Sequence, residues 1–237
     1  MNLNKLEPIK SIYARASKRK GGNKALNVLL STKLPEQSIE DLTDDRVLSA
    51  FTKKIFQSGF VWRVVENKWE NFEDSFFDFN IEKILMMPEE MLERKASDPK
   101  IIRNFNKVKT IKANAQMMFE EQQNGHSFAE FIAHWPSNDI IGLWAYLKKN
   151  GQRLGGNTGP YALRAMGKDT FLVTRDIEAY FRAHDIISGG VQTKSSQNAI
   201  QNAFNQWQTE SNYSLAQLSR LVAFSTGDNF IHIESES

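Results

Sequence analysis

Apolar residues recur at intervals of three and four along most of the chain, which is the period of an amphipathic helix. The spacing first becomes regular after Thr43 and Asp44, two residue types that favour helix N-termini. The positions on one face of this segment are Val47, Ala50, Phe51 and Phe56. Residues 61–76 continue the same spacing, so the sequence predicts helix over most of the region from 44 to 76.

Local signals at helix ends extend this prediction along the chain. Starts are expected at Asn80, Pro88, Pro99, Ser127 with Glu130 as a capping box, and either Ser137 or Asn138. Further helices are expected over residues 106–123, 196–210 and 213–224. Only residues 170–174 look like a strand, and they are too isolated to form a sheet. The pattern therefore predicts an all-α protein of roughly ten helices.

Composition narrows the class of protein. At 237 residues the chain can form one large domain or two smaller ones, and no apolar run is long enough to cross a membrane. The first ten residues lack the apolar core of a signal peptide, so a cytoplasmic protein is expected. There is no cysteine, and His126, His134, His184 and His232 show no metal-binding spacing. We expect no metal, no cofactor and no disulfide.

Charge is segregated along the chain although the net charge is only +2. Residues 1–33 carry eight cations, including Lys5 and Lys33, against the single acid Glu7. Residues 99–112 and 148–168 each carry five cations and no acid, while Asp228, Glu234 and Glu236 lie near the C-terminus. This distribution is compatible with a phosphate-facing surface or with three solvated helix faces.

One segment departs from the helical pattern, because three glycines fall within five positions between two predicted helices. Glycine allows positive φ and removes side chains that would keep a phosphate from the backbone. The second helix is expected to begin with Pro160, and its unpaired N–H groups suit an anion. The segment is either a tight helical turn or a helix-hairpin-helix that binds a DNA phosphate. In the second interpretation the phosphate-binding residues are Gly155, Gly156, Thr158, Gly159, Lys148, Lys149 and Arg153.

The hairpin, together with residues 165–171 and Asp176, resembles the helix-hairpin-helix DNA glycosylases. Within that superfamily the chain is most similar to the 3-methyladenine DNA glycosylase I family. In chain order, the motifs that carry the resemblance are residues 58–62 with Lys68, 72–79, 101–103, 107–108, 114–115 and 156–161. They span about residues 45–180.

The resemblance implies hydrolysis of the N-glycosidic bond of an alkylated purine, similar to 3-methyladenine, that is flipped out of double-stranded DNA. It implies that Asp176 is the carboxylate that stabilises charge at the sugar or orients water. Asp176 could instead be a helix N-cap or a first-turn acid. The expected base pocket comprises Trp62, Phe60, Lys54 and Tyr161. Trp62 would stack on the base or belong to the core, and Tyr161 would reach the pocket or pack the hairpin.

Two departures from the family, and one difference from the bifunctional superfamily members, refine these expectations. The family holds zinc through two Cys and two His, and this chain has no Cys. Lys54 occupies the position of a family Glu that contacts the methylated base, so the lesion could differ. Bifunctional members carry a Schiff-base Lys where this chain has Pro160 and Tyr161. We therefore expect a monofunctional enzyme, with Lys54 as the one residue that could act as a nucleophile instead.

The architecture implied by the resemblance is a two-part helical bundle. Residues 46–171 would form a central domain with the hairpin, and residues 1–45 plus 172–237 a second domain, with Asp176 at the cleft between them. The expected partner is DNA with a damaged base, and the expected state is a monomer that joins the bacterial nucleoid during repair. Alternatives are a non-catalytic helix-hairpin-helix DNA-binding protein, a glycosylase for a different lesion, and a helical protein-interaction domain.

Overall fold

The computed structural model describes residues 6–31 and 38–227, and within them it contains fourteen α helices and no strand. The helices are α1 (Ile9–Arg19), α2 (Asn23–Leu30), α3 (Asp44–Gln57), α4 (Trp62–Asn67), α5 (Trp69–Ser75), α6 (Ile81–Leu85), α7 (Glu89–Ala96), α8 (Phe105–Gln122), α9 (Phe128–His134), α10 (Ile140–Asn150), α11 (Thr158–Ala165), α12 (Arg175–Ala183), α13 (Lys194–Glu210) and α14 (Leu215–Ser225). Short 3₁₀ turns are η2 (Ile39–Asp41), η3 (Phe77–Phe79) and η4 (Ser137–Asp139). The predicted all-α class is confirmed. Lys5, Lys33, Asp228, His232, Glu234 and Glu236 lie outside the described residues.

Two of the predicted helix starts are confirmed by side-chain caps. Asn80 accepts a hydrogen bond from the N–H of Lys83, and Ser127 forms the expected capping box with Glu130. The helix expected at Pro99 is wrong, because the next helix begins only at Phe105, where Asn104 supplies the cap. The count of roughly ten is also low, since residues 62–75 form two helices that meet at Lys68.

Two compact units make up the chain: one comprises residues 1–34, 136–141 and 169–237, and the other residues 35–135 and 142–168. We call them unit 1 and unit 2. Both units are built from segments that lie far apart in the sequence. No helix in the described part of the chain has the length and apolar character of a membrane span.

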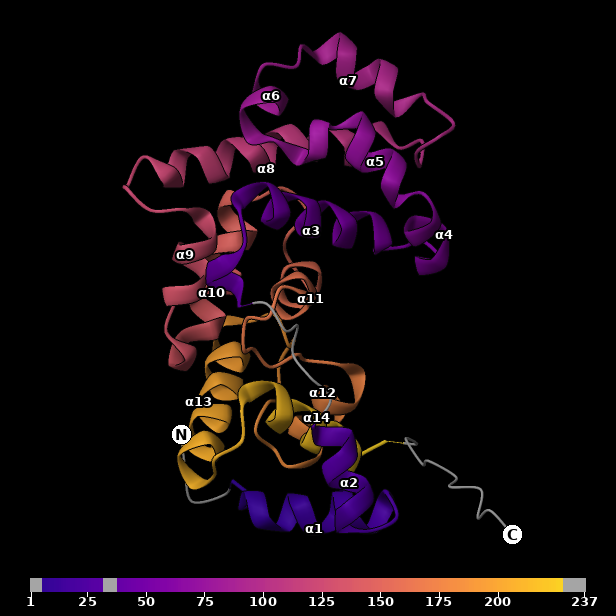
Figure 1. Cartoon of the computed structure of the whole chain (residues 1–237). Helices are drawn as coiled ribbons and strands as arrows, with labels where there is room; N and C mark the ends of the chain where they lie inside the picture. Colours follow the sequence, from indigo (N-terminus) through magenta and orange to yellow (C-terminus); the bar gives the residue numbers. More distant parts are fainter. Residues whose placement is uncertain (1–5, 32–37, 228–237) are drawn as a thin grey trace, which may run out of the picture. The chain divides into compact units, whose positions relative to one another are not determined.

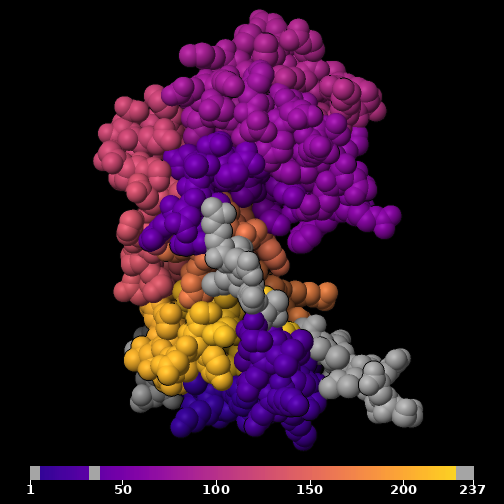
Figure 2. Space-filling view, in the orientation of Figure 1, coloured from indigo at the N-terminus to yellow at the C-terminus, as the bar shows by residue number. Residues whose placement is uncertain are grey.

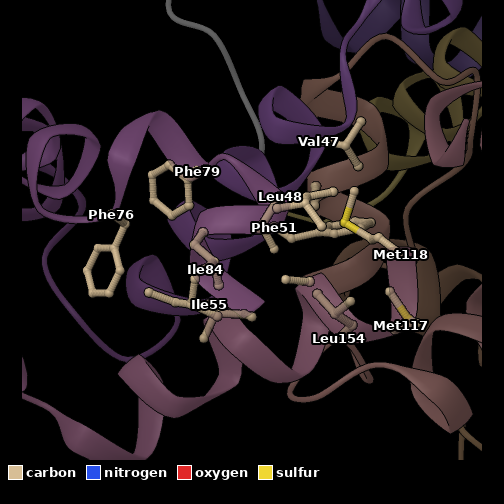
Figure 3. Packing of buried hydrophobic residues seen from close by; sticks show 14 of the residues in the cluster. Val47, Leu48, Phe51, Ile55, Phe76, Phe79, Ile84, Met117, Met118 and Leu154 are labelled. Atoms are coloured by element: carbon tan, nitrogen blue, oxygen red, sulfur yellow. The ribbon is translucent and has the colours of Figure 1, made fainter. Parts of the chain in front are cut away.

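The core of unit 2 lies between α3 and α8, which contact each other (Figure 1). Figure 3 shows side chains of this buried cluster, among them Phe51 and Ile55 of α3, Met118 of α8 and Phe79 of η3. Helix α11 also packs on α3. The hairpin that precedes α11 is therefore held close to the C-terminal half of α3.

Asp44 fixes the ends of two helices in unit 2. It lies in the first turn of α3, and its carboxylate accepts hydrogen bonds from the N–H groups of Phe128 and Ala129 at 2.8 and 2.9 Å. Gln122 at the end of α8 donates to the same carboxylate at 2.6 Å. Asp44 thus binds the N-terminus of α9 to α3 by satisfying donors that a helix leaves unpaired.

In unit 1 the N-terminal helices pack against the C-terminal ones. Figure 2 shows this contact between indigo and yellow atoms, and α1 with α14 forms its main part. Rings from α12 and α13 build the core, with Phe171 stacked on Phe204 at 4.2 Å. The Asp169 carboxylate accepts hydrogen bonds from the N–H groups of Leu215 and Ala216 at 2.9 Å each. Asp169 thus caps the N-terminus of α14, as Asp44 caps the N-terminus of α9.

Candidate nucleic-acid interface

The predicted hairpin lies between the end of α10 at Asn150 and the start of α11 at Thr158. Its glycines serve different purposes. Gly156 has φ +62° and faces open space, as predicted. Gly159 is helical, but a β-carbon there would lie 2.5 Å from Leu154 O, so only glycine fits. The expectation of positive φ therefore holds for Gly156 alone among these three glycines, and Arg153 adopts it instead at φ +59°.

The sequence predicted unpaired N–H groups at the start of the helix that begins near Pro160. In the structure the free N–H groups lie earlier, in the hairpin itself. Gly159 N–H donates to Leu154 O at 3.1 Å, and Thr158 N–H points to Gly155 O at 3.4 Å. The N–H groups of Gly155 and Gly156 donate to no acceptor in residues 6–31 or 38–227. These two amides, like that of Asn157, lie just before α11 and could receive a phosphate oxygen.

The three hairpin cations lie in different surroundings. Lys148 packs its aliphatic chain across Gly155, where a β-carbon would lie 3.1 Å from Lys148 Cγ. Lys149 instead lines a depression of about 500 Å³ between α8 and α10, together with Glu120 and Glu121. Arg153 is exposed at the turn itself. Lys148 and Arg153 are thus next to the free amides, whereas Lys149 lies beside acids.

The hairpin is fastened to α8 by a buried amide. Asn114 donates through Nδ2 to Gln152 O at 3.2 Å, and its Oδ1 accepts from Gln152 N–H at 2.7 Å. Asn114 is fully buried, so these two hydrogen bonds satisfy a side-chain amide that water cannot reach. The motif at residues 114–115 therefore has a structural role in positioning the hairpin.

A pocket of about 130 Å³ opens beside the hairpin within unit 2. It is lined by Lys54, Gln57, Ser58, Trp62, Asn157, Thr158 and Tyr161. Three of the four residues expected to bind a base are thus brought together, and two hairpin residues complete the wall. The elements that meet here are the end of α3, the start of α4 and the start of α11.

Trp62 is 55% exposed at the first residue of α4, so the interpretation of Trp62 as a core residue is wrong. Its exposed ring surface could meet a flat ligand. Tyr161 is half-buried and lines the pocket from the first turn of α11. Phe60 is exposed but does not line the pocket, and the Lys107 ammonium lies 4.7 Å from its ring centroid.

Lys54 brings a positive charge to the pocket. Its Nζ lies 4.8 Å from the Trp62 ring centroid and donates to Gln57 Oε1 at 2.8 Å. Burial lowers the pKa of Lys54, the Glu66 carboxylate acts in the opposite direction, and Lys53 lowers it further. The acid Glu66 does not line the pocket, because it pairs with Lys53 at 2.6 Å and accepts from Gln57 at 2.7 Å.

Gln57, Ser58 and Asn157 line the pocket but were not singled out from the sequence. Gln57 follows Lys54 by three positions on a helix, a spacing that places two side chains on one face. That signal was available for Gln57 once Lys54 had been chosen. Ser58 and Asn157 lie at a helix end and in a turn, where periodicity gives no signal.

Asp176 belongs to unit 1 and lies in the first turn of α12. The N-cap is Thr174, whose hydroxyl accepts from Ile177 N–H, so the alternative of Asp176 as the N-cap is wrong. Burial and Arg19 lower the pKa of Lys20, and the nearby Asp176 carboxylate partly offsets this. Gly227 approaches so closely that a β-carbon there would lie 2.5 Å from Asp176 Oδ1.

The zinc ligands implied by the resemblance do not fit this chain. The sequence has no cysteine, so the two thiolates are missing. Among the described residues there is also no group of three His, Asp or Glu side chains that could hold a metal ion. The family's zinc site therefore has no counterpart among the described residues.

Comparison with known proteins places these features in a family. A model of the family described as methyladenine glycosylase matches residues 39–165. DNA-3-methyladenine glycosylase 1 of Escherichia coli (strain K12) is 37% identical over 76 residues, which cover 32% of this chain and 41% of that protein. The chain thus matches about two fifths of the length of this relative.

Solved structures agree with the fold. 3-Methyladenine DNA glycosylase I from Staphylococcus aureus aligns with a TM-score of 0.50 and 21% identity, over 65% of this chain and 92% of that chain. The 8-oxoguanine glycosylase/lyase of Methanocaldococcus jannaschii, solved with DNA containing 8-oxoguanine, aligns with a TM-score of 0.54 and 15% identity, over 90% and 96% of the two chains. At these identities the likeness concerns the fold, and the predicted helix-hairpin-helix glycosylase fold is confirmed.

Proposed function

Because the chain belongs to the methyladenine glycosylase family, we propose that it hydrolyses the N-glycosidic bond of an alkylated purine in double-stranded DNA. The purine is of the 3-methyladenine type, and the enzyme is monofunctional, releasing the base without cutting the strand. A base inside a duplex is out of reach, so the nucleotide must rotate out of the stack into a pocket.

The observation that carries this function is the shared wall of pocket and hairpin. Asn157 and Thr158 of the hairpin line the same pocket as the exposed Trp62 ring. A phosphate held by the free amides of Gly155 and Gly156 would bring the DNA backbone next to this pocket. An extruded base could then stack on Trp62, which would contribute about 1–3 kcal/mol.

We further propose that Asp176 supplies the carboxylate at the sugar. The proposal rests on the position of Asp176 in the sequence. It lies downstream of the hairpin, where the helix-hairpin-helix glycosylases that the chain resembles have their functional acid. The sugar gains positive charge as the bond to the base breaks, and a carboxylate stabilises that charge or orients the attacking water. Such an interaction belongs to the transition state and leaves the affinity for DNA nearly unchanged.

Asp176→Asn tests both the activity and the residue. It keeps the size of the side chain and removes its charge, so base release from a duplex with 3-methyladenine should slow by about 10²-fold or more. The measurement is single-turnover release of the free base, with duplex affinity determined in parallel. Glu178→Gln is the matched control, since Glu178 is an acid of the same first turn that pairs with Arg182.

The results separate three cases. Loss of release in Asp176→Asn alone supports the assignment. Equal release in wild type and Asp176→Asn leaves Asp176 a structural acid beside Lys20 and Gly227. A wild type that binds duplex DNA and releases no base is a non-catalytic DNA-binding protein, the alternative favoured by a cation in place of the family Glu.

A further inference from the structure

We infer that Lys54 is the leaving-group residue of this pocket: its ammonium assists the departing base and extends the substrates to uncharged alkylated purines. This role depends on the proposed function, because it operates only when an N-glycosidic bond breaks.

The position of the charge carries the inference. Lys54 is the one charged side chain among the residues that line the pocket, and its Nζ lies 4.8 Å from the centroid of the Trp62 ring. A base that enters the pocket and reaches the Trp62 ring therefore comes close to this ammonium. No carboxylate lines the pocket to neutralise it, since Glu66 is engaged by Lys53 and Gln57.

Lys54 also has protons to give. An ammonium carries three donors, and the hydrogen bond to Gln57 Oε1 uses one of them. Gln57 is neutral, so this bond orients Nζ without removing its charge. Burial lowers the pKa of Lys54, which makes its ammonium a better acid than that of an exposed lysine.

The chemistry differs with the charge of the base. When the bond between C1′ and the base nitrogen breaks, its electron pair passes to the base. A cationic base becomes neutral and needs no proton, whereas an uncharged base becomes an anion. Lys54 donates a proton to that anion, water adds to the sugar carbon, and the proton that the water loses returns to the Lys54 amine. The products are the free base and the sugar hydroxyl.

The same charge has the opposite effect on binding a cationic base. Ammonium and base repel each other in the bound state, and the repulsion disappears as the electron pair reaches the base. Lys54 therefore weakens the affinity for a cationic base and modestly speeds its release from the bound state. A lysine and a glutamate at this position select for different charges on the substrate.

The test compares wild type, Lys54→Met and Lys83→Met on duplexes with either 3-methyladenine, which is cationic in DNA, or ethenoadenine, which is uncharged. Single-turnover release and duplex affinity are measured for each pair. We expect Lys54→Met to release ethenoadenine about 10²-fold more slowly, the effect of losing one general acid. It should bind the 3-methyladenine duplex more tightly and release that base only a few-fold more slowly, because removing the repulsion stabilises the bound state more than the transition state. Lys83→Met removes an exposed charge of unit 2 outside the pocket and should leave the ratio of the two rates unchanged.

Each other outcome is informative. If Lys54→Met slows both bases equally or neither, or if the wild type releases 3-methyladenine only, the leaving-group role is overturned and the proposed function stands. If the wild type releases neither base, the proposed function fails and Lys54 has no reaction to assist. Borohydride trapping of a protein–DNA adduct that is lost in Lys54→Met also overturns the role, because the amine then attacks the sugar. Unfolding temperatures of the variants show whether each is folded.

Discussion

Several lysines of the basic stretches bind backbone carbonyls and not solvent. Lys107 donates to Phe56 O and Ser58 O at 3.2 and 2.6 Å, at the C-terminal end of α3. Lys168 does the same for α9, with Ala133 O and Trp135 O at 2.8 and 2.6 Å. A cation at a helix C-terminus complements unpaired carbonyls and the helix dipole. These lysines cannot be counted toward a phosphate-facing surface, which the linear charge pattern could not reveal.

A single methyl group should distort the hairpin at Gly159. In Gly159→Ala the new β-carbon would lie 2.5 Å from Leu154 O and 3.3 Å from Leu147 Cδ1, so the backbone must move. We expect a loss of about 1–3 kcal/mol in the free energy of unfolding, measured by urea denaturation. Gly156→Asn is the control, because Asn tolerates positive φ and position 156 faces open space. Unchanged stability in Gly159→Ala would show that the turn can relax.

At the scale of elements, the hairpin should bind phosphate through one lysine and not its neighbour. Lys148→Ala removes the cation beside Gly155, so the slope of log affinity against log salt should shrink by about one counterion. Lys149→Ala is the matched control, since Lys149 lines a depression with Glu120 and Glu121 and should change the slope less. The measurement is duplex binding over a range of salt concentrations.

The loss in Lys148→Ala should be the same for every duplex sequence, because a phosphate contact carries no sequence information. Sequence-selective loss, or a larger change in Lys149→Ala, contradicts this division between the two lysines.

Helices that carry their own signals were predictable, and those that depend on distant partners were not. Asn80 and Ser127 cap their helices with side chains from the same segment, so local rules found them. Helix α1 was missed, because its apolar residues Ile9, Ile12 and Ala16 are interspersed with cations and find their partners on α14. The capping of α9 by Asp44 joins residues 84 and 85 positions apart, and no local pattern encodes such a pair.

The residues of the candidate pocket were also predictable only in part. Lys54, Trp62 and Tyr161 were found through family resemblance, while periodicity alone placed Trp62 in a core stripe. That stripe fails because α4 starts at Trp62 itself and has only six residues. Asn157 lines the pocket because of the path of the hairpin backbone. That path is set by Gly159 and Asn114, so nothing about Asn157 itself could indicate its position.

At the scale of the whole molecule, Glu7 joins the start of the chain to its C-terminal third within unit 1. Its carboxylate binds Arg15 through two bonds of 2.7 Å and accepts from Tyr180 Oη at 2.9 Å. The Glu7 carbonyl accepts from Trp207 Nε1 at 2.9 Å. One residue thus connects α1 with α12 and α13.

Glu7→Gln should therefore change how stability depends on pH. The hydrogen bonds from Arg15 lower the pKa of Glu7 below its ordinary value of 4.5. Burial acts against this shift, and the hydrogen bond from Tyr180 adds to it. A lowered carboxyl pKa stabilises the fold above pH 4.5, and this stabilisation is lost as pH falls through the folded-state pKa. We expect Glu7→Gln to lose about 1–2 kcal/mol near neutral pH, with Arg15 partly exposed to water, and to show a weaker decline in acid.

The measurement is denaturant unfolding from pH 7 to pH 3. Glu40→Gln is the control, since Glu40 is an exposed acid of unit 2. Parallel pH curves for wild type and Glu7→Gln would exclude Glu7 as a source of acid sensitivity.

The paired amide bonds between Asn114 and Gln152 have a consequence for the thermodynamics of association. A loop that must become ordered when DNA arrives loses backbone entropy, at about 1–2 kcal/mol for each residue fixed. Here the loop is already tied to the middle of a long helix by a fully buried side chain. The entropy of ordering has been spent during folding, so a phosphate meets donors that are already in place. Affinity for the backbone can then come from few contacts, and most of the binding energy stays available for extruding a nucleotide.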